Sequence, residues 1–170
     1  MDNQQVTLII AGLYLGEGHF TLSRYERAKG KWQYNCEVGF TNQDPTFIEF
    51  VAKWFDEQKI AHFISMSTND AYQIKVTRYE EINRLINILT PYLIGLKLAN
   101  AQLLQRFVKR RMSNGKAQVP YDSTDSQIFE EKAKLKGSSE TTRVPSIYVS
   151  RRSMHTYDDD IVRSHDESMS

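Results

Sequence analysis

One carboxylate stands out among the groups of this sequence that could do chemistry. Glu17 lies between two glycines, near the end of the apolar stretch TLIIAGLYLGEGHFTL, residues 7–22. The residues up to Gly16 predict a helix, and a helix C-terminus carries partial negative charge, so a glutamate there is locally unfavourable. A residue that breaks a local rule in this way marks either a functional site or a tolerated accident.

Other catalytic patterns find little support in the 170 residues. There is no G-x-S-x-G sequence and no Walker loop. The single cysteine, Cys36, excludes an internal disulfide and a cysteine-based zinc site, and it fits a reducing cytosol. A hydrolase built on His19, His62 or Cys36 is therefore disfavoured, and His155 and His165 do not have the spacing of metal ligands.

Composition and charge narrow the class of protein. The apolar content of 40% and charged content of 25% are those of an ordinary globular chain. The apolar run 8–15 is far shorter than the roughly 20 residues that span a bilayer. No charged segment precedes it, so we expect no signal peptide, no membrane partner and an intracellular location: cytoplasm, nucleoid or organelle. Residues 1–116 carry 15 Lys/Arg against 11 Asp/Glu, which favours a nucleic-acid partner.

The elements that position the carboxylate follow from the apolar periodicity. A helix is predicted over Thr7–Gly16, with Gly18 as its stop. Its apolar residues are not confined to one face, so we expect a second partner besides its own sheet. From His19 the period becomes two, and residues 19–27 and 32–40 predict an antiparallel hairpin around Gly30 with one dry and one wet face.

The chain then repeats this order of helix and hairpin. Asp44 is the expected N-cap of a helix that has Pro45 at its first position. The further predicted elements are a hairpin of Ile60–Met66 and Ala71–Thr77, a helix capped by Thr77 and Glu80 that runs to Leu89, a break at Pro91, a helix from about Lys97 to Arg111, and a short helix over Ser126–Lys136.

These elements predict an α+β fold of order αββαββα, with a four-stranded antiparallel sheet backed by helices on one face. We expect a core domain over residues 1–116 and a C-terminal helical extension over 117–137. Residues 138–170 are rich in Ser, Arg and Asp and predict a flexible tail.

This order of elements, together with the sequence IAGLYLGEG at Ile10–Gly18, resembles the LAGLIDADG homing endonucleases. The resemblance covers the first two thirds of the chain. Glu17 replaces the second aspartate of the motif conservatively, whereas Leu15 stands where the first aspartate usually is. The positions that match outright are Ala11, Gly12, Leu13 and Gly18.

The resemblance implies a site-specific double-strand DNA endonuclease that acts as a homodimer. One motif per chain gives one active site, and cutting both strands needs two, so the target should be long and pseudo-palindromic. In the family, the motif helices of two subunits pack together, and Gly12 and Gly16 have a suitable G-x-x-x-G spacing. The implied dimer-interface residues are Leu8, Ala11, Gly12, Leu15 and Gly16.

The resemblance also implies hydrolysis of a phosphodiester that depends on Mg²⁺ or Mn²⁺. Glu17 would ligate the metal together with the main-chain carbonyl of Gly16, which accounts for an acid at the negative end of a helix. Asn42, or its neighbour Gln43, would organise water near the metal, and Lys97 would lie near the scissile phosphate. On the residues alone, Asn42 and Gln43 fit a simple turn equally well. For Lys97 the alternative is an ordinary exposed lysine.

Target recognition would lie on the wet face of the sheet, because an antiparallel sheet can follow the major groove. The same residue types occur on any solvent-facing strand. By parity, the outward residues are Thr21, Ser23, Tyr25 and Arg27 on the first strand, Gln33, Asn35 and Glu37 on the second, Ser65 and Ser67 on the third, and Ala71, Gln73, Lys75 and Thr77 on the fourth. Phosphate contacts are expected from Lys29, Lys31, Arg106, Lys109, Arg110 and Arg111.

Two binding functions on the same fold are the alternatives. One is an intron maturase that binds RNA, and the other is a DNA-binding protein that has lost cleavage. Leu15 in place of the first aspartate hints at such a loss, but Glu17, which resembles the metal ligand, is retained. A nuclease would lose cutting in Glu17→Gln and keep DNA binding, whereas a maturase would bind RNA with or without Glu17.

Overall fold

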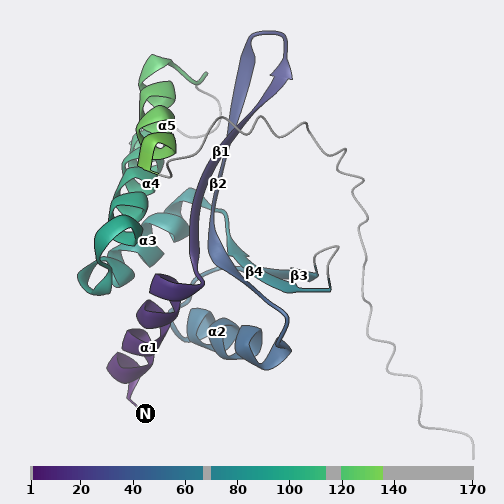
Figure 1. Ribbon diagram of the computed structural model, residues 1–170, viewed down its shortest axis with the longest axis vertical. Coiled ribbons are helices and arrows are strands. Elements are labelled where there is room, and N and C mark those ends of the chain that lie inside the picture. Colours follow the sequence, from purple (N-terminus) through teal and green to yellow (C-terminus); the bar gives the residue numbers. More distant parts are fainter. Residues whose placement is uncertain (1, 67–69, 114–119, 136–170) are drawn as a thin grey trace, which may run out of the picture.

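The structure, a computed structural model, describes residues 2–66, 70–113 and 120–135, so the expected tail lies outside the described residues. The elements are α1 (Asn3–Gly16), β1 (His19–Ala28), β2 (Lys31–Asn42), α2 (Pro45–Glu57), β3 (Phe63–Met66), β4 (Tyr72–Val76), α3 (Tyr79–Leu89), the 3₁₀ turn η1 (Thr90–Tyr92), α4 (Gly95–Ser113) and α5 (Ser123–Leu135). Helices back one face of a four-stranded antiparallel sheet (Figure 1). The predicted α+β fold and its order αββαββα are confirmed.

Strand β2 organises the sheet, whose order is β1-β2-β4-β3. The first part of β2 pairs with β1 to form a long hairpin that extends away from α1 (Figure 1), and its last part pairs with β4. Alternate residues of β1 and β2, such as Phe20 and Cys36, are buried against the helices. The described helices leave the other face of the sheet open, so the predicted dry and wet faces are both present.

Gly39 marks the point where β2 changes partner. It pairs with His19 of β1 on one side and with Lys75 of β4 on the other. A Cβ atom at Gly39 would lie 2.0 Å from the backbone oxygen of Ile74. The close approach of β4 therefore requires a residue without a side chain, a constraint that the alternating pattern did not reveal.

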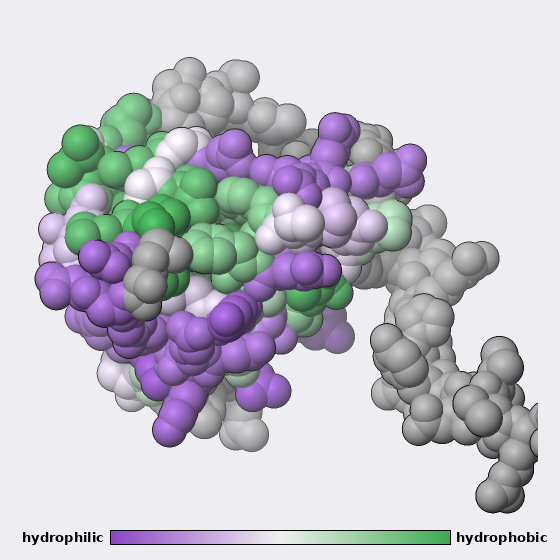
Figure 2. All heavy atoms as spheres, turned by 90° about the horizontal axis from the view of Figure 1, so that it is seen from below, coloured by the Kyte–Doolittle hydropathy of each residue, from purple (hydrophilic) through white to green (hydrophobic). Residues whose placement is uncertain are grey.

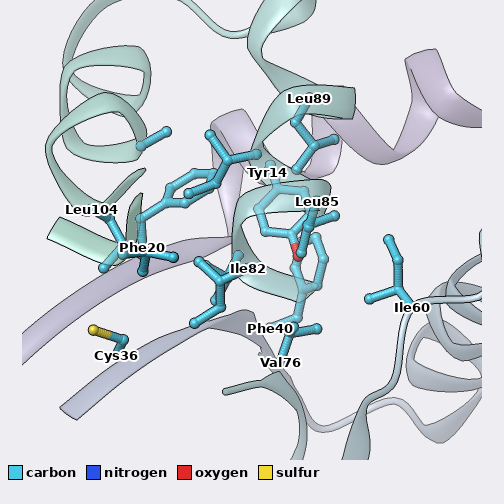
Figure 3. Close-up of a cluster of buried hydrophobic side chains, with 14 of the residues drawn as sticks. Tyr14, Phe20, Cys36, Phe40, Ile60, Val76, Ile82, Leu85, Leu89 and Leu104 are labelled. Atoms are coloured by element: carbon cyan, nitrogen blue, oxygen red, sulfur yellow. The ribbon is translucent and has the colours of Figure 1, made fainter. Parts of the chain in front are cut away.

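An aromatic cluster fixes α1 on the sheet. The Tyr14 ring is fully buried, with its centroid 4.2 Å from that of Phe40 and 5.4 Å from that of Phe20. Leu85 of α3 lies on the same cluster (Figure 3). A Cβ atom at Gly18 would lie 2.2 Å from the Tyr14 ring. Gly18 follows the end of α1, as expected of the residue that stops the helix. It has no positive φ, so the glycine is required here to make room for the Tyr14 ring.

Two predicted helix starts are wrong, and each error has a local cause. Helix α1 begins at Asn3 and not at Thr7, because Asp2 and Gln5 form a capping box over a first turn that is polar. Helix α3 has Arg78 as its N-cap, without a side-chain capping bond, so the Thr77–Glu80 capping box does not form. The Asp44 cap of α2 is confirmed, since its carboxylate accepts from the Thr46 N–H at 2.9 Å.

The second hairpin is shorter than predicted. Strand β3 begins at Phe63, and Ile60 is instead buried in the core. Strand β4 begins at Tyr72, so Ala71 precedes the strand and is buried, and Thr77 lies beyond its end. Helices α4 and α5 lie where they were expected, with ends shifted by one to three residues. Among the described residues, no helix is both long and apolar enough to cross a bilayer.

The close packing at Gly39 generates a stability prediction. We expect Gly39→Ala to lower the free energy of unfolding by about 2 kcal/mol, because the new methyl group must push β4 away from β2. Urea denaturation measures this change. Thr41→Ala, an exposed site on the same strand, is the control and should cost less than about 1 kcal/mol. Equal losses for the two variants would contradict the packing argument.

Candidate functional site

Glu17 ends α1 in a position where its carboxylate is exposed. The backbone N–H groups of Glu17 and Gly18 both donate to the Leu13 carbonyl, at 2.8 and 3.2 Å. Neither reaches the Gly16 carbonyl, which is one of the last carbonyls that a helix leaves without an internal donor. The last turn of α1 has no basic residue. The helix end thus presents a carboxylate and a carbonyl where a cation would be favoured.

Asn42 lies beside this carboxylate, at the end of β2 as expected. Its Nδ2 donates to Glu17 Oε2 at 2.9 Å, and its Oδ1 accepts from the Asp44 N–H at 2.8 Å. The Asp44 backbone therefore orients the amide so that its donor end faces the carboxylate. Gln43 is exposed and takes no part in these two hydrogen bonds. Asp44 was recognised as a helix cap, but its role in orienting Asn42 was not expected.

Lys97 reaches the same place from the first turns of α4. Its Nζ donates to the Gly18 carbonyl, and burial lowers the pKa of its ammonium group. Residues from α1, β2 and α4 therefore meet at the end of α1. The sequence placed Glu17, Asn42 and Lys97 together only through the resemblance, and the structure brings the three within one small region.

The residues present fit part of a metal site. Within the described ranges, no group of three or more His, Cys, Asp and Glu side chains could hold a metal ion. Mg²⁺ keeps several waters and is commonly bound by one or two carboxylates plus phosphate oxygens. The Glu17 carboxylate and the Gly16 carbonyl therefore suit an ion whose remaining ligands come from phosphates and from outside the single chain.

The uncovered face of the sheet carries polar side chains in register. Thr21 lies opposite Glu37, Ser23 opposite Asn35, and Tyr25 opposite Gln33. Ser65 pairs with Gln73, which places Ser65 on this face. Ser67 lies outside the described residues. The expected reading residues that lie here and are exposed or half-buried are Thr21, Ser23, Tyr25, Gln33, Asn35, Glu37, Ser65, Gln73 and Lys75. Arg27 is exposed but lies at a register shift between Glu26 and Ala28, so the strand pairing does not place it on this face as parity predicted.

Glu37 lies between the side chains of His19 and Lys75 on this face. Its carboxylate oxygens lie 3.4 Å from His19 Nε2 and 3.5 Å from Lys75 Nζ. The contact with His19, followed by the charge of Lys75, outweighs desolvation and holds the pKa of Glu37 below its ordinary value. His19 was not among the expected reading residues. Its place as the first residue of the alternating run was the signal that pointed to this face.

Three arginines of α4 contact acidic residues in or next to α5. Arg106 pairs with Glu131, and Arg110 pairs with Asp122. Arg111 is only 1% exposed and lies against the buried carboxylate of Asp125. The expectation of phosphate contacts is therefore not supported for these three arginines. Lys109, and Lys29 and Lys31 around the hairpin turn, are exposed.

One face of α1 is apolar and uncovered by the described residues. Leu8 and Ile9 are 48% and 42% exposed, and a Cβ atom at Gly12 or Gly16 would meet nothing within 4 Å. Leu15 is half-buried. Ala11 was expected on this face. It is only 2% exposed and packs in the core of its own chain, so this expectation is wrong.

Two further apolar residues were missed by the sequence analysis. Ile94 and Leu96 are 70% and 63% exposed, on either side of Gly95, and they immediately precede Lys97. The bond from Lys97 to Gly18 holds this segment near the end of α1. The sequence signal for this exposed pair was the occurrence of two apolar residues on either side of a glycine at the start of a helix.

Comparison with known proteins agrees with this geometry. A family model described as LAGLIDADG endonuclease matches residues 10–108, more than half of the chain. The fold is similar to that of a LAGLIDADG homing endonuclease, I-GzeII, solved in complex with its DNA target, with a TM-score of 0.58 and 20% identity. That match covers 79% of this chain and 44% of the other, so this chain spans less than half of that protein.

Two shorter proteins match over most of their length. The archaeal intron-encoded homing endonuclease I-Vdi141I, complexed with DNA, has a TM-score of 0.64 and 18% identity, over 82% of this chain and 87% of that one. The homing endonuclease I-CvuI, with a DNA target in the presence of magnesium and the DNA not cleaved, has a TM-score of 0.58 and 18% identity, over 84% and 87%. No match was found among the curated proteins.

The charge cluster at Glu37 generates a pH prediction. Because the pKa of Glu37 in the folded chain lies below the ordinary 4.5, its carboxylate stabilises the fold above that pH, and the contribution disappears as the pH falls through the lower value. We expect Glu37→Gln to lower the free energy of unfolding by about 1 kcal/mol at neutral pH and by less near pH 3, below the ordinary pKa of 4.5. Denaturant titrations at both pH values measure the difference, with the exposed Glu49→Gln as control.

Proposed function

The chain belongs to the LAGLIDADG endonuclease family, and we propose that it is a site-specific DNA endonuclease that cuts both strands of a long pseudo-palindromic target as a homodimer. The observation that carries the proposal is the contact between Asn42 and Glu17 at the end of α1, beside a sheet face lined with polar side chains. A protein that acts in this way on DNA works inside the cell.

The residues around Glu17 suit phosphodiester hydrolysis. A Mg²⁺ or Mn²⁺ ion held by Glu17 and the Gly16 carbonyl would supply an activated water and a positive charge for the reacting phosphate. Asn42 keeps the Glu17 carboxylate in one orientation, and its own orientation is set by the Asp44 backbone. Lys97 places a positive charge beside Gly18, where it can attract the phosphate that enters the site.

The outer face of the sheet suits recognition of base edges. Asn35, Gln33 and Gln73 offer the amide groups that pair with adenine, and Arg27, exposed near the hairpin turn, offers the fork that suits guanine. Lys75 and Glu37 neutralise each other in part, so this carboxylate repels the DNA backbone less than a free one would. The exposed lysines of the hairpin turn suit phosphates.

The apolar face of α1 suits a second copy of the chain. Gly12 and Gly16 stand one helical turn apart on that face with open space above them, so the backbone of a partner helix can approach closely. Figure 2, seen from below, shows apolar surface gathered on the side where α1 lies in Figure 1. Closed pairing of two α1 helices would bring two Glu17 carboxylates near each other, one for each DNA strand.

The decisive test of cleavage is Glu17→Gln. We expect the variant to lose cutting by about a thousandfold or more, because the neutral amide cannot hold the metal, while DNA binding is retained. A plasmid library of partly palindromic sites, incubated with Mg²⁺, measures nicking and double-strand cleavage. Chelation of the metal should abolish cutting by the wild type.

The control is Glu49→Gln, which changes an exposed glutamate on α2 and should cut like the wild type. If neither the wild type nor Glu17→Gln cuts but both bind DNA tightly, the chain is a DNA-binding protein without cleavage activity. If both bind structured RNA in preference to DNA, the maturase function replaces the nuclease.

The assembly is tested by Gly12→Leu. We expect this variant to fold and to sediment as a monomer, because its side chain has room within its own chain but blocks the approach of a second α1. Analytical ultracentrifugation compares it with the wild type and with Lys53→Leu, which adds a leucine at an exposed site on α2. Dimerisation of Gly12→Leu at wild-type strength would contradict the proposed interface.

A further inference from the structure

Helix α5 lies beyond the residues that match the family model, which end at residue 108. It nevertheless packs beside α4 and along the inner face of the β1–β2 hairpin (Figure 1). The hairpin extends past the helices that cover the rest of the sheet, and an isolated two-stranded hairpin is only marginally stable in water. The contacts between α5 and the hairpin can therefore influence the shape of the hairpin's outer face.

The first contact surrounds Arg24, an inward residue of β1. Its guanidinium lies 4.8 Å from the centre of the Trp32 ring of β2 and 4.5 Å from the centre of the Phe129 ring of α5. The cation is therefore shared between the hairpin and the helix. Contacts of this type strengthen as they are withdrawn from water.

The second contact surrounds Tyr34, which pairs with Arg24 across the hairpin. Its hydroxyl lies 2.9 Å from Ser126 Oγ of α5. Its ring centroid lies 5.9 Å from that of Phe129 and 4.8 Å from that of Tyr121. Both members of one cross-strand pair are thus held from the side of the helix layer.

The third contact is a buried lysine. Lys132 is only 2% exposed, and its Nζ donates to the Phe20 carbonyl of β1 at 2.7 Å and to Asn100 Oδ1 of α4 at 2.8 Å. Burying a charge is costly unless hydrogen bonds satisfy it, so this group ties three elements together at a defined geometry. Helix α5 is itself anchored on α4 by the buried ion pair of Asp125 and Arg111.

We propose that α5 is a brace that sets the curvature of the β1–β2 hairpin, with Phe129 and Ser126 as positioning residues for DNA recognition. The proposal rests on the proposed function. The pair Arg24–Tyr34, which α5 contacts, lies between two outward pairs, Ser23–Asn35 and Tyr25–Gln33. A shift of the brace therefore tilts the expected reading residues of the outer half of the hairpin and leaves the end of α1 in place.

The test compares Phe129→Ala with two matched variants. Phe129→Tyr keeps a ring beside Arg24, and Gln127→Ala changes an exposed residue on the same helix. We expect amide exchange in residues 23–35 to quicken about tenfold in Phe129→Ala, with α2 unaffected, and to stay at the wild-type rate in the other two. The melting temperature of all variants is measured in parallel.

A DNA-binding readout separates positioning from simple support. Each full-length variant selects from a random-sequence duplex library without added metal, so that the DNA is not cut. We expect Phe129→Ala to lose preference at the outer base pairs of the selected site and to keep preference at the central ones. Phe129→Tyr should restore the wild-type pattern.

Two results would overturn the proposal, the first by removing the brace and the second by removing its role in DNA recognition. The first is faster exchange spread evenly over α2, α3 and the hairpin, because α5 would then support the whole fold. The second is unchanged preference at the outer base pairs despite a looser hairpin. A wild type that selects no DNA site would instead defeat the proposed function and the recognition role with it, whereas exchange confined to the hairpin would retain the conformational brace.

Discussion

The packing of Tyr14 at the junction of α1 and β1 is the contact on which the rest of the site depends. Its ring lies against Phe20 and Phe40, and Gly18 leaves the space that the ring occupies. This contact fixes where α1 ends and where β1 begins, so the direction of the intervening Glu17 follows from core packing. The dense packing of the core keeps the end of α1 in one position. The hydrogen bond from Asn42 then only adjusts the orientation of the Glu17 carboxylate.

The sheet extends this constraint to the face that we propose as the DNA-recognition surface. His19 is both the first residue of β1 and a partner of Gly39, the residue at which β2 also meets β4. The end of α1, the His19–Glu37–Lys75 cluster and the centre of the sheet are therefore neighbours. Under the proposed function, cleavage and recognition share one rigid frame, and the distal hairpin, which lies farthest from that frame, is the part that needs α5.

The sequence predicted what depends on local periodicity and missed what depends on distant contacts. Alternation in residues 19–40 predicted the hairpin and its dry and wet faces. Asn42 was placed near Glu17 only through the family resemblance, and its hydrogen bond to the Glu17 carboxylate was not predicted. The constraint at Gly39 comes from Ile74. Arg111 was assigned to phosphates because nothing local revealed its buried partner Asp125. The motif does not indicate whether Ala11 faces the core of its own chain or a partner helix.

Among the described residues of one chain the ligand set for a metal ion is incomplete, and under the proposed function this has a chemical consequence. One exposed carboxylate and one carbonyl cannot displace most of the water from a Mg²⁺ ion, which dehydrates reluctantly and is usually held with the help of phosphate oxygens. A chain without DNA would therefore hold the ion weakly and hydrolyse nothing. Target DNA and the second copy would complete the ligand set together, so that recognition by the sheet and assembly through α1 become conditions for the chemistry. A nuclease that supplied every ligand itself would lack this protection against cutting at sites that the sheet does not fit.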